Sequence, residues 1–394
     1  MALPGVAGEV SSGPRGQTSK EGGGGMAGAT IQGTKTYADE RVREGVAERH
    51  FRQVQGLWLS SIGLGTYLGR NDDTTDDLYR SAVVQAVQSG CNVLDTAINY
   101  RCQRSERNIR DALRELAKQN IPREQVVVAT KGGFIPFENE SPPDVTDYLQ
   151  KTYFGPGVVR PQDIVGECQV ITPDFLGNQL DRSLSNLGVE TIDIYYVHNP
   201  EMQLTEVSSE ELSRRLRAVF EFLEKAVSDG KIQFYGTATW GGYRQPPTAK
   251  SFLSLESVIS LATEAGGEKH HCRFVQLPYS LAMTEALTEQ NQPLNGKSVS
   301  VLSAAGELGV AVMSSASIGQ GRLTKGLPDW LGKLFKGLTS DTQRSLQFAR
   351  STPGLTTALV GMKRRAHVDE NLAVAKVSPA AAEDFLKLFE VDNR

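Results

Sequence analysis

The feature that most constrains the fold is a repeated alternation of short β-rich apolar runs with longer amphipathic stretches, from about Tyr37 onward. Eight runs have the length and composition of buried strands, and each is followed by a stretch with helical periodicity. Strands that alternate with helices pair in parallel. The predicted strands are 62–65, 92–95, 126–130, 192–197, 234–238, 274–276, 310–313 and 357–360. The predicted helices are 75–88, 105–119, 173–187, 210–228, 255–265, 299–308, 339–350 and 365–375.

Two architectures accommodate such a repeat: a closed (β/α)8 TIM barrel and an open, doubly wound sheet. The open sheet usually carries G-x-G-x-x-G after its first strand, as a loop that holds a pyrophosphate. Here Gly63, Gly65 and Gly69 have the spacing G-x-G-x-x-x-G, and the acidic stretch 71–77 that follows would repel a phosphate. We therefore expect an α/β fold of the (β/α)8 TIM barrel class.

Three segments lie outside the repeat. Residues 1–33 are rich in Gly and Ser and poor in large apolar side chains, so we expect a disordered tail, followed by one barrel domain over 34–394. Residues 52–60 look like a hairpin turning at Gly56 that caps the N-terminal end of the barrel. A long insertion, 133–172, follows the third strand and emerges at the C-terminal end, where it is either a functional loop or a structural flap with its own small core.

Composition excludes several classes of function. Lys and Arg total 42 against 46 Asp and Glu, which gives no basic surface for a nucleic acid or an anionic membrane. No apolar run is long enough to span a bilayer, and the four cysteines have no metal-ligand spacing. We expect a cytoplasmic monomer or weak homo-oligomer without a metal. Organellar targeting by residues 1–33 is the lesser alternative, because the tail has acidic residues beside its basic ones.

Four residues with chemically useful side chains fall at the C-terminal ends of consecutive predicted strands. They are Asp95, Tyr100 in the loop after it, Lys131 and His198. In a barrel these positions share one mouth, so Asp95 and Lys131 are expected to pair there. An ammonium beside Tyr100 is expected to lower the pKa of the phenol. Each residue alone has an ordinary structural explanation, but four together on one rim favour carbonyl chemistry.

These stretches resemble the catalytic tetrad motifs of the aldo-keto reductases. The resemblance rests on Leu94-Asp95-Thr96-Ala97 with Tyr100, on Ala129-Thr130-Lys131, and on Tyr195-Tyr196-Val197-His198. It implies a barrel that binds NADP(H) in an extended pose and passes hydride between the nicotinamide and a substrate carbonyl. It also implies that Tyr100 is the general acid, that Lys131 and Asp95 tune it, and that His198 positions the substrate.

The same resemblance implies a set of cofactor contacts. Gln276 would bind the carboxamide, Tyr279 would stack on the nicotinamide, and Lys363 with Arg364 would bind a ribose phosphate at a helix N-terminus, which favours NADP over NAD. The full expected set is Thr239, Gln276, Tyr279, Ser315, Ser317, Gly361, Lys363, Arg364, His367, Glu370 and Asn371.

The chain also departs from the family pattern. The family commonly has Ser-Asn after the fifth barrel strand, whereas this chain has Ala238 and Thr239. The run 236–240 is somewhat similar to the channel-associated branch of the family. Two functions therefore stay open: an NADP(H)-dependent oxidoreductase acting on aldehydes or ketones (or on the corresponding alcohols), and an NADP(H)-binding regulatory or sensor protein. The complete tetrad favours turnover.

Overall fold

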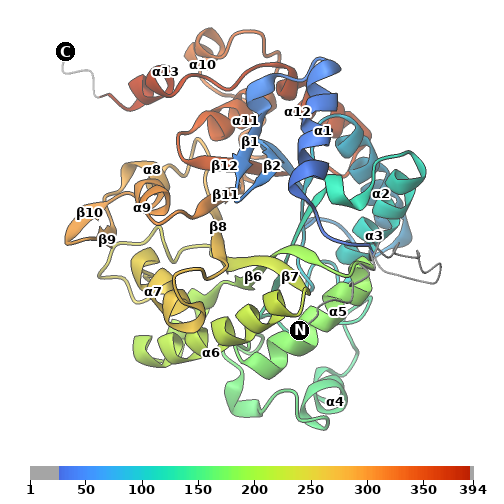
Figure 1. The fold of residues 1–394 in the computed structure, drawn as a ribbon, viewed down its shortest axis with the longest axis vertical. Helices are drawn as coiled ribbons and strands as arrows, with labels where there is room; N and C mark the ends of the chain where they lie inside the picture. Colours follow the sequence, from blue (N-terminus) through green and yellow to red (C-terminus); the bar gives the residue numbers. More distant parts are fainter. Residues whose placement is uncertain (1–25, 391–394) are drawn as a thin grey trace, which may run out of the picture.

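The computed structural model describes residues 26–390 and contains a closed barrel of eight parallel strands in the order β3-β4-β5-β6-β7-β8-β11-β12 (Figure 1). The barrel closes where β12 pairs with β3, with Ala358 opposite Ile62. The predicted TIM barrel is confirmed, and the open sheet is excluded. The barrel strands are β3 (Ile62–Gly65), β4 (Val93–Asp95), β5 (Val127–Gly132), β6 (Ile192–His198), β7 (Ile232–Ala238), β8 (Cys272–Pro278), β11 (Ala311–Ser315) and β12 (Leu355–Gly361).

Helices form an outer ring whose apolar faces pack on the strands. Local sequence determines where they begin and end: the helix Pro173–Leu187 starts after Thr172, whose hydroxyl accepts from the Phe175 N–H, and stops at Gly188, which has φ 63°. The ring consists of α2 (Asp73–Gln88), α3 (Arg104–Lys118), α5 (Pro173–Leu187), α6 (Ser209–Ser228), α7 (Leu255–Gly266), α9 (Val301–Glu307), α11 (Asp341–Ser351) and α12 (Arg365–Leu372). Smaller elements are α8 (Glu285–Thr288), β9 (Gln292–Leu294), β10 (Lys297–Val299), α10 (Asp329–Leu334) and α13 (Ala382–Leu386).

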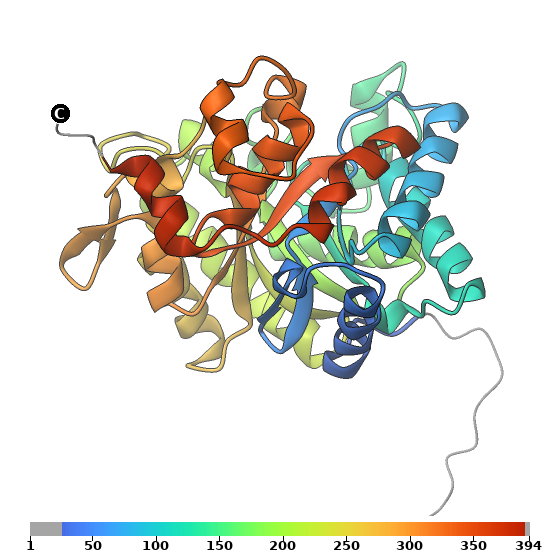
Figure 2. The same ribbon diagram turned by 90° about the horizontal axis from the view of Figure 1, so that it is seen from above.

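The N-terminal end of the barrel is closed by the predicted hairpin and by a helix that the sequence did not predict. Strands β1 (Phe51–Val54) and β2 (Leu57–Ser60) turn at Gln55 and Gly56, which both have positive φ. Helix α1 (Ile31–Arg43) lies beside the hairpin, at the opposite end from the orange segment after β11 (Figure 2). The expected tail was therefore wrong at its C-terminal end, since residues 26–33 are ordered; residues 1–25 lie outside the described residues.

Residues 26–30, which we call the N-terminal plug, cross the closed end of the barrel. The Ala29 N–H donates to the Asp193 carboxylate at 2.7 Å, and the Gln233 amide donates to the Ala29 carbonyl at 2.7 Å. Asp193 also pairs with Arg123 at 2.7 Å, and both side chains are buried. Ala29 packs with inward-facing residues of the hairpin and strands, so the plug completes the barrel interior.

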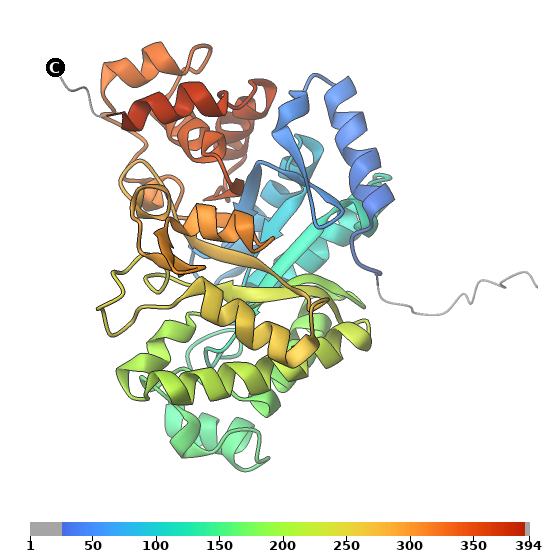
Figure 3. The ribbon, with the colours of Figure 1, turned by 60° about the vertical axis from the view of Figure 1, so that its left-hand side comes forward.

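The insertion 133–172 contains a short helix, α4 (Val145–Leu149), and two helical turns, Gln150–Phe154 and Pro161–Asp163. In two views α4 lies outside the ring, beyond α5 and α6 (Figures 1 and 3). A separate apolar cluster joins the insertion to α5, with Tyr153, Val159 and Val170 packed around Phe175. The insertion thus shares a small core with α5, while Phe134 at its start lines the cavity, so it has features of both expected roles.

Candidate active site

A cavity of about 920 Å³ opens at the C-terminal end of the barrel. A volume of this size lies at the upper end of the range of pockets that hold a small molecule or a cofactor. Seven of the eight barrel strands contribute to its wall, as expected for the functional end of this fold. Their lining residues are Gly65, Asp95, His198, Ala238, Gln276, Ser315, Leu359, Val360 and Gly361.

Lys131 and Asp95 form a buried ion pair at the floor of the cavity, as predicted. The Lys131 ammonium donates to both carboxylate oxygens of Asp95 and to the Thr96 carbonyl, all at 2.8 Å. Lys131 is 1% exposed. Burial lowers the pKa of Lys131, while the adjacent carboxylate opposes that shift. Charge balance and three short contacts therefore fix the ammonium in place.

Tyr100 lines the cavity above this pair. The Lys131 nitrogen lies 5.1 Å from the centre of the Tyr100 ring, and the Tyr67 ring packs against its other side at 4.9 Å between centroids. The expected fall in the pKa of Tyr100 was wrong. Its pKa is raised well above the ordinary value, first by burial and then by the Asp95 carboxylate, because a nearby negative charge disfavours the phenolate. The phenol therefore stays protonated at neutral pH.

His198 ends β6 and faces the same cavity. Its ring meets the edges of Tyr100, at 5.9 Å between centroids, and of Phe134, at 4.8 Å. Burial, followed by the nearby Lys131 charge, lowers the pKa of His198 well below its usual value. Nδ1 of the ring is buried without a protein partner. The structure thus brings the four predicted tetrad residues together, with a neutral imidazole and a protonated phenol beside one buried ion pair.

Gln276 and Tyr279 have different outcomes. Gln276 lines the cavity, and its amide donates to Asp95 at 2.7 Å, which ties it to the ion pair. Tyr279 does not line the cavity: it is fully buried and stacks on Phe348 of α11, with the ring planes 5° apart. Tyr279 directly follows β8, which ends at Pro278, and its ring packs outward against α11. The structure therefore does not place Tyr279 with the expected cofactor residues that line the cavity.

The other expected cofactor residues divide into two groups. Lys363 and Arg364, in the turn between β12 and α12, lie outside the cavity wall; Lys363 is half-buried and Arg364 is exposed. The Ser317 hydroxyl lines the cavity but is already bonded to Ser314, at 3.0 Å. The remaining members that line the cavity are Thr239, Ser315, Gly361, His367, Glu370 and Asn371.

Sequence reasoning missed parts of the wall. Tyr67 and Leu68, in the loop after β3, line the mouth of the cavity. Tyr67 is more than half exposed, and Leu68 is half exposed. Gln320, Thr324 and Lys325 line the far end from the loop after β11. Their position directly after barrel strands was the available signal, because every such loop contributes to the same rim. Among residues 26–390 no cluster of His, Cys, Asp or Glu could hold a metal ion, and no helix is long and apolar enough to cross a membrane.

Comparison with known proteins agrees with this geometry. The model of the aldo/keto reductase family matches residues 61–326, which is more than half of the chain and includes the whole tetrad. The chain belongs to the aldo/keto reductase family. That assignment explains the common origin of the barrel and the rim residues.

Individual relatives are more distant. The chain is 32% identical to the NADH-specific methylglyoxal reductase of Escherichia coli over 36% of this chain and 39% of that protein. It is 30% identical to the 6-dehydroglucose reductase of Novosphingobium aromaticivorans over 48% of this chain and 51% of that protein. These matches thus span about half, or less, of the relatives' length. The solved aldo/keto reductase of Klebsiella pneumoniae in complex with NADP and acetate has the same fold, with a TM-score of 0.57 at 20% identity, over 88% of this chain and 97% of that one.

Proposed function

We propose that this chain is an NADP(H)-dependent oxidoreductase that transfers hydride between nicotinamide and the carbonyl of a small aldehyde or ketone, or the corresponding alcohol. The observation that carries the proposal is the buried Lys131–Asp95 pair directly beside Tyr100 and His198 at the floor of the cavity. A bound nicotinamide cofactor would supply the hydride. The protein's own residues would supply the proton and hold the carbonyl.

The cavity wall fits an extended dinucleotide, because unpaired polar atoms lie along its length. Thr239 Oγ1 near the tetrad and Asn371 Oδ1 at the far end are both buried without a protein partner. A buried polar atom without a partner is costly, so such atoms are expected to bond a ligand. These atoms and His198 Nδ1 come from three different parts of the barrel rim, the ends of β6 and β7 and helix α12, which supports a ligand that reaches several walls of the cavity.

The protonation states assign a role to each tetrad residue. Tyr100 is protonated at neutral pH and can donate its proton to the oxygen that gains charge as hydride arrives. The Lys131 ammonium, 5.1 Å from the Tyr100 ring, would stabilise the phenolate that remains. His198 is neutral and can donate one hydrogen bond to the same oxygen. Asp95 holds the ammonium at the correct position.

The preference for NADP(H) over NAD(H) rests on cations at the far end of the cavity. Lys325 lines the wall there, together with His367 at the start of α12. Lys363 and Arg364 lie in the adjoining turn, close to a helix N-terminus. Cations at such a position favour a ribose phosphate. A relative named for NADH specificity and a solved neighbour that contains NADP show that both cofactors occur among similar proteins.

Stopped-flow mixing of NADPH-loaded protein with a panel of small aldehydes and ketones tests the function. We expect cofactor absorbance to decay with at least one carbonyl compound and to stay constant without one. Tight NADPH binding with no oxidation by any member of the panel would instead support the regulatory function, which the Ala238-Thr239-Trp240 run motivates.

A further inference from the structure

The loop that carries Tyr100 continues into an unusual backbone segment. Arg101, Cys102 and Gln103 have φ values of 50°, 53° and 71°, so three consecutive residues other than glycine occupy the left-handed region. Left-handed backbone is unfavourable for residues with a Cβ, and strained segments persist only where their surroundings hold them. The strain begins at the residue directly after the proposed proton donor. Contacts that hold it therefore also determine where Tyr100 points.

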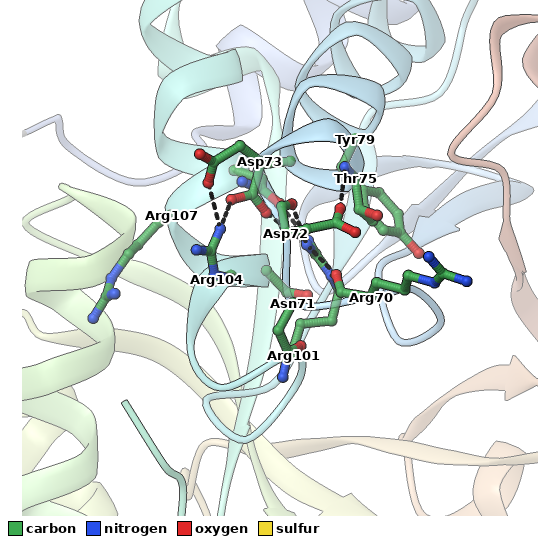
Figure 4. Close-up of polar contacts among 12 residues, drawn as sticks. Arg70, Asn71, Asp72, Asp73, Thr75, Tyr79, Arg101, Arg104 and Arg107 are labelled. Carbon is green, nitrogen blue, oxygen red and sulfur yellow. Dashed lines mark hydrogen bonds and ion pairs between the residues drawn. The ribbon is translucent and has the colours of Figure 1, made fainter. Parts of the chain in front are cut away.

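The strongest of these contacts come from the Arg101 guanidinium, which is buried. It donates to the Arg70 carbonyl from Nε at 2.8 Å and from Nη2 at 2.6 Å (Figure 4). It also donates to Asp76 at 2.6 Å and to Asn108 at 2.7 Å. Charge-assisted bonds in a buried fork of this kind are strong and directional. Arg101 thus connects the strained turn to the start of α2, to α3 and to the loop between β3 and α2.

The same guanidinium supports the cavity mouth. It lies over the Tyr79 ring at 5.3 Å, and the Tyr79 hydroxyl donates to the Leu68 carbonyl. A Cβ at Gly69 would approach Arg101 Nε within 3.3 Å, so the loop packs closely against this side chain. Residues 67–72 therefore rest on Arg101 through Leu68, Gly69 and Arg70. Tyr67, at the start of this loop, is the residue that packs on the Tyr100 ring.

Cys102 and Gln103 fix the other side of the turn to the start of the insertion. The Asn139 N–H donates to the Cys102 carbonyl at 3.0 Å, and the Gln103 amide donates to the Phe137 carbonyl at 2.9 Å. The strained segment therefore bridges the two loops that flank the mouth. Arg101 is the charged residue of this segment. The hydrogen bonds of its side chain all go to residues 67–76 and to Asn108.

We propose that Arg101 is a positioning residue, which holds Tyr100 and the Tyr67–Leu68 wall in their working arrangement through its bonds to the Arg70 carbonyl, Asp76 and Asn108. This inference rests on the proposed function, since it assumes that Tyr100 delivers a proton. Arg101 does not line the cavity and does not touch the tetrad side chains directly. Its effect on turnover is exerted through the backbone turn and the loop that packs on Tyr100.

The test compares Arg101→Met, which keeps the stem and removes every donor, with Arg101→Lys, which keeps the charge. We expect Arg101→Met to lower kcat about 10- to 100-fold, because small displacements of a reacting group have effects of this size. NADPH affinity is expected to stay near the wild-type value, because Arg101 is not among the residues that line the cavity. Arg101→Lys should recover part of kcat. Hydrogen exchange in peptides covering 67–72 should be faster in Arg101→Met.

Arg104→Met provides the matched control. Arg104 also pairs with Asp76, and with Asp73 at 3.0 Å, but it makes no bond to the loop 67–72 carbonyls. The Arg104→Met variant should retain both the wild-type kcat and slow hydrogen exchange in residues 67–72. Wild-type kcat in Arg101→Met, or equal losses in Arg101→Met and Arg104→Met, would overturn the inference. Absence of turnover in the wild-type protein would overturn the proposed function instead. The positioning role would then be judged by hydrogen exchange alone, and unchanged exchange in peptides 67–72 of Arg101→Met would overturn it.

Discussion

The Tyr100 side chain is confined on several sides by groups from different elements. Lys131 of β5 lies against its ring, His198 of β6 meets its edge, and Tyr67 of the loop after β3 covers it. Side chains from separate strands can hold one reacting group more firmly than a single flexible loop can. The proton donor is thus positioned from two directions, by the barrel strands through Lys131 and His198 and by the loop after β3 through Tyr67.

Replacing Tyr100 by Phe removes only the proton donor. We expect kcat for carbonyl reduction to fall by about 100-fold or more, because general acid catalysis contributes at least that much. NADPH affinity should stay nearly constant, as measured by fluorescence titration, because the ring and its packing remain. Tyr279→Phe is the control: it removes a phenol that packs on Phe348 away from the cavity, so kcat should be retained. Turnover of Tyr100→Phe at the wild-type rate would exclude Tyr100 as the acid.

Residue-level prediction succeeded where a strand end alone determines the outcome. Asp95, Lys131 and His198 end barrel strands, and the fold itself brings such positions to one rim. Tyr279 does not join the cavity, because a role assigned by resemblance does not show that its ring packs against Phe348 of α11. The prediction also failed for the pKa of Tyr100, because the sequence does not show how deeply the phenol is buried or how close the Asp95 charge lies to it.

At the scale of elements, the turn from β12 into α12 provides the basic end of the site. Its N-cap is Arg364, whose side chain makes no capping bond, so the first turn of α12 has unsatisfied N–H groups. His367, Glu370 and Asn371 of the same helix line the cavity. The helix therefore presents both its positive end and polar side chains to the far part of the cavity.

The combined replacement Lys363→Ala and Arg364→Ala should weaken NADPH binding roughly tenfold or more, because charged hydrogen bonds contribute at least that much. NADH binding should change far less, since NADH lacks the ribose phosphate. Isothermal titration with each cofactor measures the two affinities. Lys376→Ala, an exposed lysine just beyond α12, is the charge control. Equal losses for NADPH and NADH would place the phosphate elsewhere, with Lys325 as the next candidate.

Element prediction was accurate for the barrel and poor at the N-terminus. All eight predicted strands are present, because buried parallel strands read as continuous apolar runs. Helix α1 was missed because the face that it buries consists of Gly33, Thr34, Tyr37 and Ala38, mostly small side chains. Hydrophobic periodicity cannot reveal such a face. A Cβ at Gly33 would lie 2.4 Å from the Glu124 carbonyl oxygen, so close packing there requires glycine.

The whole molecule has two ends with separate tasks. The C-terminal end holds the cavity, while the N-terminal end is sealed by the plug, the hairpin and α1. Asp193 is the main polar anchor of the sealed end, since it binds Arg123, the Ala29 N–H and the Val128 N–H. Stability and chemistry should therefore respond to different substitutions.

Replacing Asp193 by Ala leaves the Arg123 cation buried without its partner. Breaking a buried pair in this way is expected to lower the free energy of unfolding by about 3–5 kcal/mol. Urea denaturation measures the change, and kcat of the remaining folded protein should stay close to the wild-type value. The control is Asp181→Ala, which removes the exposed partner of Lys231 and should change stability little. A similar small effect for both variants would show that Asp193 is not an anchor.

The position of Met26 at the sealed end has a practical consequence. Its carbonyl accepts from the Glu190 N–H, just before β6 begins, whereas His198 at the other end of the same strand faces the cavity. A surface tether attached through the chain that precedes Met26 would therefore hold the protein by its back. Immobilised on a bead or an electrode in this orientation, it would present its open mouth to the surrounding solution, and diffusing reactants would reach it without obstruction by the support.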